Sequence, residues 1–244
     1  MKITILTIFP EMFDAFIHTS IIKNAINKNL VSIEVVDIRA YTTNKHNKVD
    51  DTPFGGGSGM IMTLQPVVDC LRKYQTKDSY TILMSAKGNK LTQKKVRSLS
   101  INTNHLILIC GRYEGIDDRI VNYIDEEISI GDYIITGGEL SSMVLSDAVI
   151  RVIDGVIKTD SHQDESYEDG LLEYPQYTKP FDFEGYKVPD VLLSGNHKNI
   201  KEFRKKEALR LTYERRKDLL ENKELNLEET KLLKLIMENN NEKH

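Results

Sequence analysis

Two glycine-rich loops carry the residue types that would hold a small ligand. The first covers residues 110–117 (CGRYEGID) and the second covers residues 129–140 (SIGDYIITGGEL). Glycine lets main chain turn tightly and come within hydrogen-bonding distance of a flat ligand. Plain turn chemistry explains any single glycine as well. Two loops that combine glycines with Tyr and acidic side chains point instead to a binding site.

The segments around these loops predict where that site lies. Each loop follows an apolar strand-like run, residues 105–110 and residues 127–130, and each leads into a helical pattern. Open α/β sheets bind ligands outside the carboxyl ends of their strands. The sequence therefore predicts an α/β protein with its site at that edge of the sheet.

The rest of the N-terminal half agrees with a parallel sheet. Residues 2–9 read as a strand, residues 11–28 as a helix and residues 31–38 as a strand, which is a βαβ pattern with a right-handed crossover. Further predicted elements are the strand 80–85 and the helices 66–74, 92–99 and 139–153. No G-x-G-x-x-G follows the first strand, so a dinucleotide fold lacks its main sequence support.

A long polar connection, residues 40–64, separates the second strand from the next helix. Its glycine cluster at residues 55–59 lacks the Lys-Ser/Thr of a phosphate-binding P-loop. Connections of this length are usually functional or disordered. We expect a mobile loop that contacts substrate.

Composition bounds the class of protein. The chain has 244 residues with 40% hydrophobic and 29% charged content, typical of a globular protein of one large or two smaller domains. No apolar run approaches a membrane span, and the N-terminus resembles a strand rather than a signal peptide, so we expect a cytoplasmic protein with no membrane partner. Cys70 and Cys110 lack metal-ligand spacing, and we expect buried, reduced thiols.

Charge is unevenly distributed. The chain carries −4 overall, whereas residues 198–217 contain nine Lys or Arg and three Glu. Such a segment on an acidic chain fits a polyanion contact, and a solvated helix face laced with Glu–Lys pairs fits equally. Residues 158–169 are polar without an apolar face and read as a linker. Helices are predicted over 198–211, 213–222 and 227–239, the first with Asn196 as its N-cap.

The helix over 139–153 is apolar almost all round, which indicates burial in a core or in an interface. Asp147 and Arg151 lie four residues apart on the same line as Leu140 and Val144. This pair is either a simple helix ion pair or a sign that Arg151 meets a partner across a contact, because an unpaired buried charge is costly. We favour a functional Arg151.

Five motifs in one order give the chain a family resemblance. They are the two loops above together with residues 49–60 (VDDTPFGGGSGM), 170–180 (GLLEYPQYTKP) and 192–197 (LLSGNH). The chain resembles the bacterial tRNA (guanine-N1)-methyltransferases, the TrmD family of the SPOUT superfamily, from residue 1 to about residue 220. The resemblance implies a parallel α/β sheet with trefoil-knotted cofactor loops and a small C-terminal helical domain. It divides the chain into an S-adenosylmethionine-binding domain (1–157), a flexible linker (158–169) and a tRNA-binding helical domain (170–244).

The resemblance also implies S-adenosylmethionine as methyl donor. Its binding set would be Leu83, Met84, Ser85, Gly111, Tyr113, Gly115, Ile130, Gly131, Asp132, Tyr133, Ile134, Ile135, Gly137 and Gly138. Glu114 would lie close to the donor as one of the catalytic residues.

Methylation at guanine N1 needs a base for the N1 proton and a positive group for the charge that develops on O6. By resemblance, Arg151 would stabilise the negative charge that develops on O6. The family base is an Asp in a D-S-F run, and this chain has Glu165-Ser166-Tyr167 there. Glu165 inherits the role, and the neighbouring Asp164 is the alternative.

The implied substrate is a tRNA whose guanosine immediately 3′ of the anticodon turns out of its stack into the site. The implied tRNA phosphate contacts are Lys198, Arg204, Arg210, Arg215 and Arg216. Glu173 matches a position linked to substrate or to a magnesium ion, or is an exposed turn acid, and no metal ligand is assigned. The resemblance also implies a homodimer with a composite active site. In that arrangement Arg151 and Glu165 would reach the donor pocket from the partner chain.

Two alternatives stay open at this point. One is a ribose 2′-O methyltransferase of the same superfamily, which would not need a carboxylate base at residues 164–165. The other is a catalytically silent RNA-binding module, which would not bind the donor.

Overall fold

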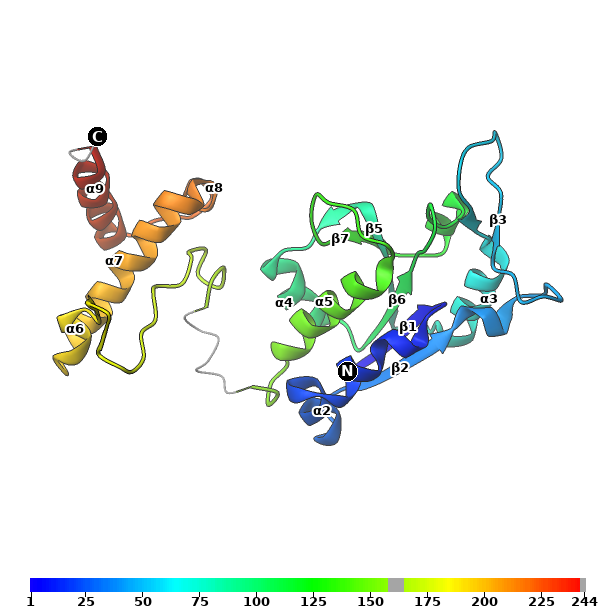
Figure 1. The fold of residues 1–244 in the computed structure, drawn as a ribbon, viewed down its shortest axis with the longest axis horizontal. Helices are drawn as coiled ribbons and strands as arrows, with labels where there is room; N and C mark the ends of the chain where they lie inside the picture. The colour runs from blue at the N-terminus through cyan, green and yellow to red at the C-terminus, as the bar shows by residue number, and fades with distance from the viewer. Residues whose placement is uncertain (158–164, 242–244) are drawn as a thin grey trace. The chain divides into compact units, whose positions relative to one another are not determined.

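A computed structural model describes residues 1–157 and 165–241 (Figure 1). The chain divides into two compact units, Met1–Thr159 and Asp160–His244. The first unit contains a five-stranded sheet in the order β2-β1-β6-β5-β7, with every neighbouring pair parallel. The class of fold predicted from the sequence, an α/β protein with a parallel sheet, is confirmed.

The sheet consists of β1 (Lys2–Thr7), β2 (Ser32–Asp37), β5 (Ser79–Lys90), β6 (His105–Cys110) and β7 (Glu126–Ser129). The helices of the unit are η1 (Pro10–Phe13), α1 (Asp14–His18), α2 (Ser20–Asn27), η2 (Ile38–Tyr41), α3 (Leu64–Tyr74), α4 (Gln93–Asn102), η3 (Asp118–Asn122) and α5 (Gly138–Arg151). A short antiparallel pair, β3 (Asp50–Asp51) and β4 (Ile61–Met62), lies outside the sheet.

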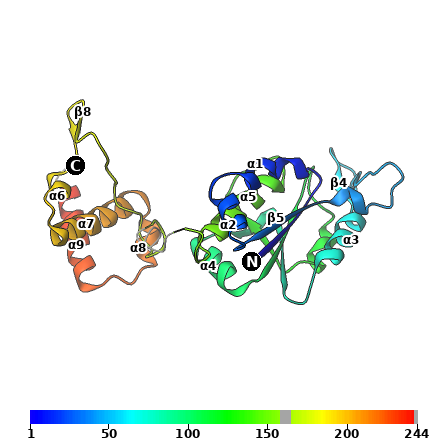
Figure 2. The same cartoon turned by 90° about the horizontal axis from the view of Figure 1, so that it is seen from below.

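Two hydrophobic cores cover the two faces of the sheet, as parallel sheets require. Successive side chains of a strand point to opposite faces. On β6, Leu106 and Leu108 pack in one cluster with residues of α2, α4 and α5, while Ile107 and Ile109 pack in the other with residues of α3. Figure 2 shows these helices on opposite sides of the sheet. β6 is buried along its whole length and therefore fixes the position of the loop that follows it.

The prediction of a single helix over residues 11–28 is wrong. The segment forms η1, α1 and α2, with extended backbone at Thr19 and a positive φ of 51° at Ser20. The Thr19 hydroxyl donates to the carbonyl of Ala15 at 2.7 Å, a local bond that competes with helix continuation. Of the apolar side chains in this segment, Phe13 and Ile22 are buried, whereas Ile21 is 39% exposed.

The 40–64 connection pairs its last residues with the first glycine-rich loop. The amide of Met62 donates to the carbonyl of Gly115 at 2.9 Å, and the amide of Glu114 donates to the carbonyl of Met60 at 3.0 Å. These contacts join segments about fifty residues apart. Periodicity within the connection gave no sign of them.

The second unit contains the β8 (Asp182–Phe183) and β9 (Tyr186–Lys187) hairpin and the helices α6 (Asp190–Leu193), α7 (His197–Arg215), α8 (Lys217–Glu221) and α9 (Leu227–Asn241). Asn196 caps α7 as predicted, accepting from the amide of Asn199 at 3.2 Å. A small core around Leu171, Leu209 and Ile236 holds α7 against α9. Among residues 1–157 and 165–241, no helix is long and apolar enough to cross a membrane.

Candidate active site

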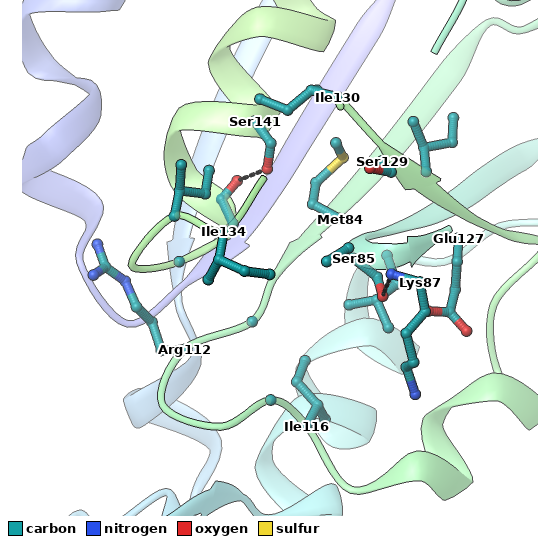
Figure 3. Close-up of a pocket in the computed structure, with 18 of the residues that line it drawn as sticks. Met84, Ser85, Lys87, Arg112, Ile116, Glu127, Ser129, Ile130, Ile134 and Ser141 are labelled. Atoms are coloured by element: carbon teal, nitrogen blue, oxygen red, sulfur yellow. Dashed lines mark hydrogen bonds between the residues drawn. The ribbon is translucent and has the colours of Figure 1, made fainter. Parts of the chain in front are cut away.

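A cavity of about 390 Å³ opens where β6 and β7 end, beside the irregular middle of β5, between the two glycine-rich loops (Figure 3). Every residue of the predicted donor-binding set lines it except Asp132, and Glu114 lines it too. The carboxylate of Asp132 instead forms an exposed ion pair with Lys90 at 3.2 Å. The site thus lies at the carboxyl ends of parallel strands, where the sequence placed it.

Gly137 and Gly138 let the two loops pack against each other. The amide of Gly138 donates to the carbonyl of Gly111 at 2.8 Å. A Cβ at Gly138 would lie 2.7 Å from the Cα of Cys110, and a Cβ at Gly137 would lie 2.3 Å from Nε of Arg112. Contact between the loops therefore requires both glycines, a reason that the sequence alone did not reveal.

A buried ion pair ties the loops together behind the cavity. Glu139 has 0% of its surface exposed, and its Oε2 lies 2.8 Å from Nε of Arg112, an ion pair rather than a linear hydrogen bond. The Thr7 hydroxyl at the end of β1 donates to Oε1 of Glu139 at 2.8 Å. The Arg112 guanidinium also lies 4.6 Å from the ring centroid of Phe9.

Arg112 thus joins β1, the first loop and the start of α5, and its Nη1 donates to the carbonyl of Thr136 in the second loop at 3.3 Å. Sequence reasoning missed this pair. Glu139 stands in the first turn of α5, where the helix dipole favours an acid, and that position is the signal that was available.

The first loop turns through two left-handed residues, Tyr113 at φ 60° and Gly115 at φ 125°. A left-handed tyrosine is an uncommon backbone state that collects at functional sites. Between them, Glu114 projects beside Gly59, where a Cβ would lie 2.6 Å from the Cγ of Glu114. Gly59 in the 40–64 connection therefore makes room for a carboxylate at the cavity.

Polar atoms at the cavity differ in how well they are satisfied. The Ser141 hydroxyl donates to the carbonyl of Gly138 at 2.9 Å (Figure 3). The Ser129 hydroxyl donates to the carbonyl of Gly131 at 3.0 Å. Nζ of Lys87 pairs with Asp118 at 2.8 Å, which raises the pKa of Lys87. Oε2 of Glu127 is buried without a hydrogen-bond partner among residues 1–157 and 165–241. Buried acceptors normally have a partner, so this oxygen is a candidate contact for a ligand of the cavity that Glu127 lines.

Of the predicted catalytic residues, Glu114 lines this cavity and Arg151 does not. Arg151 follows Gly138 by thirteen residues on α5, about 20 Å along the axis at about 1.5 Å per residue. Glu165 belongs to the second unit and is half-buried there. Asp164 lies outside the described residues. Within the first unit, the donor loops and Arg151 therefore stand at opposite ends of one helix.

An apolar line runs along the outer side of α5. Leu140 and Val144, four residues apart, are each about half exposed, whereas Leu145 and Val149 are fully buried in the core. The prediction for this helix left core and interface open. The structure shows a core face and an uncovered apolar face on the same helix.

The predicted substrate contacts of the second unit have different surroundings. Arg210 is held by Glu207 at 2.6 Å and by Glu214 at 2.8 Å. Arg216 pairs with Asp218 at 2.6 Å and lies 5.7 Å from the ring centroid of Tyr167. The others are Lys198, Arg204 and Arg215, which are exposed, and Glu173, which accepts from Nε2 of Gln176 at 2.7 Å. These predicted roles stay predictions.

Acidic, histidine and cysteine side chains do not form a metal-binding cluster in the described part of the chain, where no group of three or more is placed to hold an ion. Both cysteines are buried and free, as predicted. Burial, with the nearby charge of Asp37, raises the pKa of Cys70 to about 12, so neither its burial nor its ionisation favours reactivity.

The first unit is thus an α/β domain whose parallel sheet carries a cavity at its strand ends, bordered by two hydrogen-bonded loops. A family model described as tRNA (Guanine-1)-methyltransferase TrmD matches residues 1–222. The chain therefore belongs to that methyltransferase family. It is 51% identical over 236 residues to a tRNA (guanine-N(1)-)-methyltransferase of Aster yellows witches'-broom phytoplasma (strain AYWB), covering 97% of this chain and 98% of that protein.

Relatives with the same name in Bacillus cereus (strain AH820) and Bacillus anthracis (strain CDC 684 / NRRL 3495) are each 52% identical over 243 residues. These matches cover 98% of this chain and 99% of each relative. The family resemblance of the motifs is confirmed.

Proposed function

We propose that this protein transfers the methyl group of S-adenosylmethionine to N1 of the guanosine immediately 3′ of the anticodon in tRNA. The observation that carries the proposal is the cavity between residues 110–117 and 129–140, in a chain that belongs to the tRNA (guanine-N1)-methyltransferase family. The proposed setting is the cytoplasm, where the substrate is found.

The residues at the cavity fit the donor. Ile116, Ile134 and Met84 offer apolar surface to an adenine ring, and they lie around one space in Figure 3. The unsatisfied carboxylate oxygen of Glu127 would accept from a hydroxyl or amino group of the ligand. Glu114 adds a second carboxylate, which would attract a positively charged group of the donor. The bound donor supplies a methyl group on positively charged sulfur.

The chemistry at guanine requires a base for the N1 proton and a cation for O6, and we assign both roles to residues outside the lining of the first unit's cavity. We assign the removal of the N1 proton to Glu165, with Asp164 as the alternative base. We assign to Arg151 the stabilisation of the negative charge that develops on O6. Holding these groups against an oriented base and donor accounts for much of the rate.

A homodimer would bring Arg151 to a donor cavity. Gly138 and Arg151 are the two ends of α5, and the half-exposed Val144 lies near its middle. If two copies of α5 pair antiparallel through the Leu140 and Val144 face, Arg151 of one protomer lies beside residue 138 of its partner. Such an isologous contact covers the apolar face and completes both sites at once.

A trefoil knot is part of the proposal. Its support is the close passage of the second loop against the first, with Gly138 hydrogen-bonded to Gly111 and packed on the main chain of Cys110. Threaded connections are rare, so the family supplies the reason to expect one here.

We propose that the second unit holds tRNA through α7. Lys198, Arg204 and Arg215 are exposed, and they suit phosphate contacts better than Arg210, whose charge already faces two carboxylates. Glu173 is the proposed contact for substrate or for a magnesium ion.

Mass spectrometry of nuclease-digested tRNA tests this function. Unmodified tRNA incubated with the protein and S-adenosylmethionine should gain one N1-methylguanosine, located 3′ of the anticodon. A transcript with adenosine at that position should gain none. A methyl group on ribose O2′ would replace the proposal by the 2′-O alternative, in which Glu165→Gln with Asp164→Asn should be nearly silent. Absence of any transfer, with no heat of donor binding, would leave only an RNA-binding module.

A further inference from the structure

A second cavity, of about 440 Å³, lies wholly within the second unit. Its walls come from residues 174–181, from the segment around α6 and from the N-terminal half of α7. We call it the aromatic pocket, after Tyr174, Tyr177 and Phe181. It lies beside the hydrophobic core of this unit, which includes Leu209 and Ile236, and Tyr174 packs against that core.

Aromatic side chains at this pocket keep much of their surface in solvent. Tyr177 is 47% exposed and Phe181 is 52% exposed. Leu193, which also lines the pocket, is more than half exposed. An exposed apolar cluster of this kind marks a binding surface rather than a folding core.

Charge at the pocket is entirely positive. Arg204 lies with its guanidinium 4.9 Å from the ring centroid of Tyr174, and Lys179 stands on the opposite wall-forming segment. None of the described residues that line the pocket is acidic, although the chain has 37 Asp and Glu. Lys201, one turn before Arg204 on α7, is exposed and extends the positive surface. A ligand that suits this surface is aromatic and anionic.

Hydrogen bonds hold the aromatic wall in place. The amide of Val188 donates to the carbonyl of Phe181 at 2.9 Å, and the amide of Gly185 donates to the Asp182 carboxylate at 2.9 Å, which closes the β8–β9 hairpin. The side chain of Gln176 is tied to Glu173. A wall that is already ordered loses little conformational freedom when a ligand binds.

We propose that the aromatic pocket takes an unpaired nucleobase of the bound tRNA, distinct from the guanosine that is methylated. The base stacks on the rings of Tyr177 and Phe181, and its flanking phosphate lies on Arg204 and Lys179. Single-stranded RNA is recognised in this way, through aromatic stacking together with a cationic path for the backbone. This inference rests on the proposed function for the identity of the RNA.

Binding of an unmodified tRNA transcript, followed by fluorescence anisotropy at fixed salt, tests the pocket. Tyr177→Ala and Phe181→Ala should each weaken binding by roughly 5- to 150-fold, the range for loss of one stacked base. Tyr177→Phe keeps the ring and should bind like wild type. Tyr186→Ala is the matched control, because Tyr186 is 81% exposed on the same hairpin but outside the pocket.

Abasic transcripts identify the base. Removing the base from one loop nucleotide at a time should reveal a position whose loss equals that of Phe181→Ala, and the two losses should not add when combined. Fully additive losses at every position would overturn the proposal. So would wild-type tRNA affinity in both alanine variants, or a change in oligomeric state in place of a change in RNA affinity, which would make the pocket a protein contact.

Failure of this inference is distinguishable from failure of the proposed function. At saturating tRNA, Phe181→Ala should still form N1-methylguanosine, since the donor cavity lies in the other unit. Wild-type protein that binds tRNA but forms no N1-methylguanosine would refute the function and leave the binding comparison valid.

Discussion

Removing the charge of Glu139 should loosen the donor site without touching the ligand. Glu139→Gln keeps the shape of the side chain and an acceptor for the Thr7 hydroxyl, but leaves the Arg112 guanidinium without its counter-ion. The pair is well shielded, with Glu139 at 0% and the Arg112 side chain at 15% exposure. Breaking a buried pair from one side costs about 3–5 kcal/mol.

The lower end of this range applies here. Arg112 retains some solvent, its bond to Thr136 and its contact with Phe9, so we expect a loss of about 3 kcal/mol in the free energy of unfolding of the first unit. At about 2–3 kcal/mol/M in urea, this lowers the midpoint by roughly 1 M. Donor affinity should fall at least about tenfold, because the two loops lose the ion pair that joins them.

Urea unfolding and titration calorimetry with S-adenosylmethionine measure the two effects. The exposed pair of Lys90 and Asp132 in the same region is the control, and Asp132→Asn should change stability by less than about 1 kcal/mol. Adding Arg112→Met to Glu139→Gln should cause no further loss, since the unpaired charge is then gone. A Glu139→Gln protein with the wild-type urea midpoint and donor affinity would refute this reasoning.

Three further outcomes follow from the account. Arg151→Ala should lower turnover by orders of magnitude with little change in donor affinity. Mixing the Arg151→Ala protein with the Glu165→Gln protein should restore some activity. Equal loss of turnover and donor affinity, or no rescue on mixing, would contradict the proposed composite site. Arg215→Glu should weaken tRNA binding and flatten its salt dependence more than Arg210→Glu, because Arg210 is already paired with Glu207 and Glu214; an equal effect of the two changes would remove the distinction between exposed and paired arginines. Burial, with the nearby charge of Lys2, lowers the pKa of His105 below 6.5, so the folded state favours the neutral imidazole. The contribution of His105 to the free energy of unfolding is therefore full above pH 6.5. It is lost as the pH falls through 6.5 towards the folded-state pKa. Urea titrations at a series of pH values should show this fall, and His105→Gln should flatten it; a variant with an unchanged slope would assign the fall to other groups.

Much of the fold and the place of the site could be predicted from the sequence. Buried strands such as β6 are continuous apolar runs, and the glycine, tyrosine and acidic residues of loops 110–117 and 129–140 identify these loops. Local patterns therefore predicted the parallel sheet and the two loops that border the cavity, whereas the full set of lining residues came from the family resemblance.

Long-range contacts were not predictable in this way. The Arg112–Glu139 pair joins two loops, and the 40–64 connection joins the first loop through backbone bonds that any sequence could make. The break at Thr19 and Ser20 was also missed, since the apolar pattern continues across it. The location of Arg151 at the far end of α5 follows from helix length, but the role proposed for it requires a second chain, which no pattern in one sequence displays.

A crystal structure of the protein with S-adenosylmethionine bound tests the central claim most directly. We expect the donor between residues 111–115 and 130–138, with a polar group of the ligand hydrogen-bonded to the carboxylate of Glu127. A donor bound elsewhere on the chain, with these two loops empty, would contradict it.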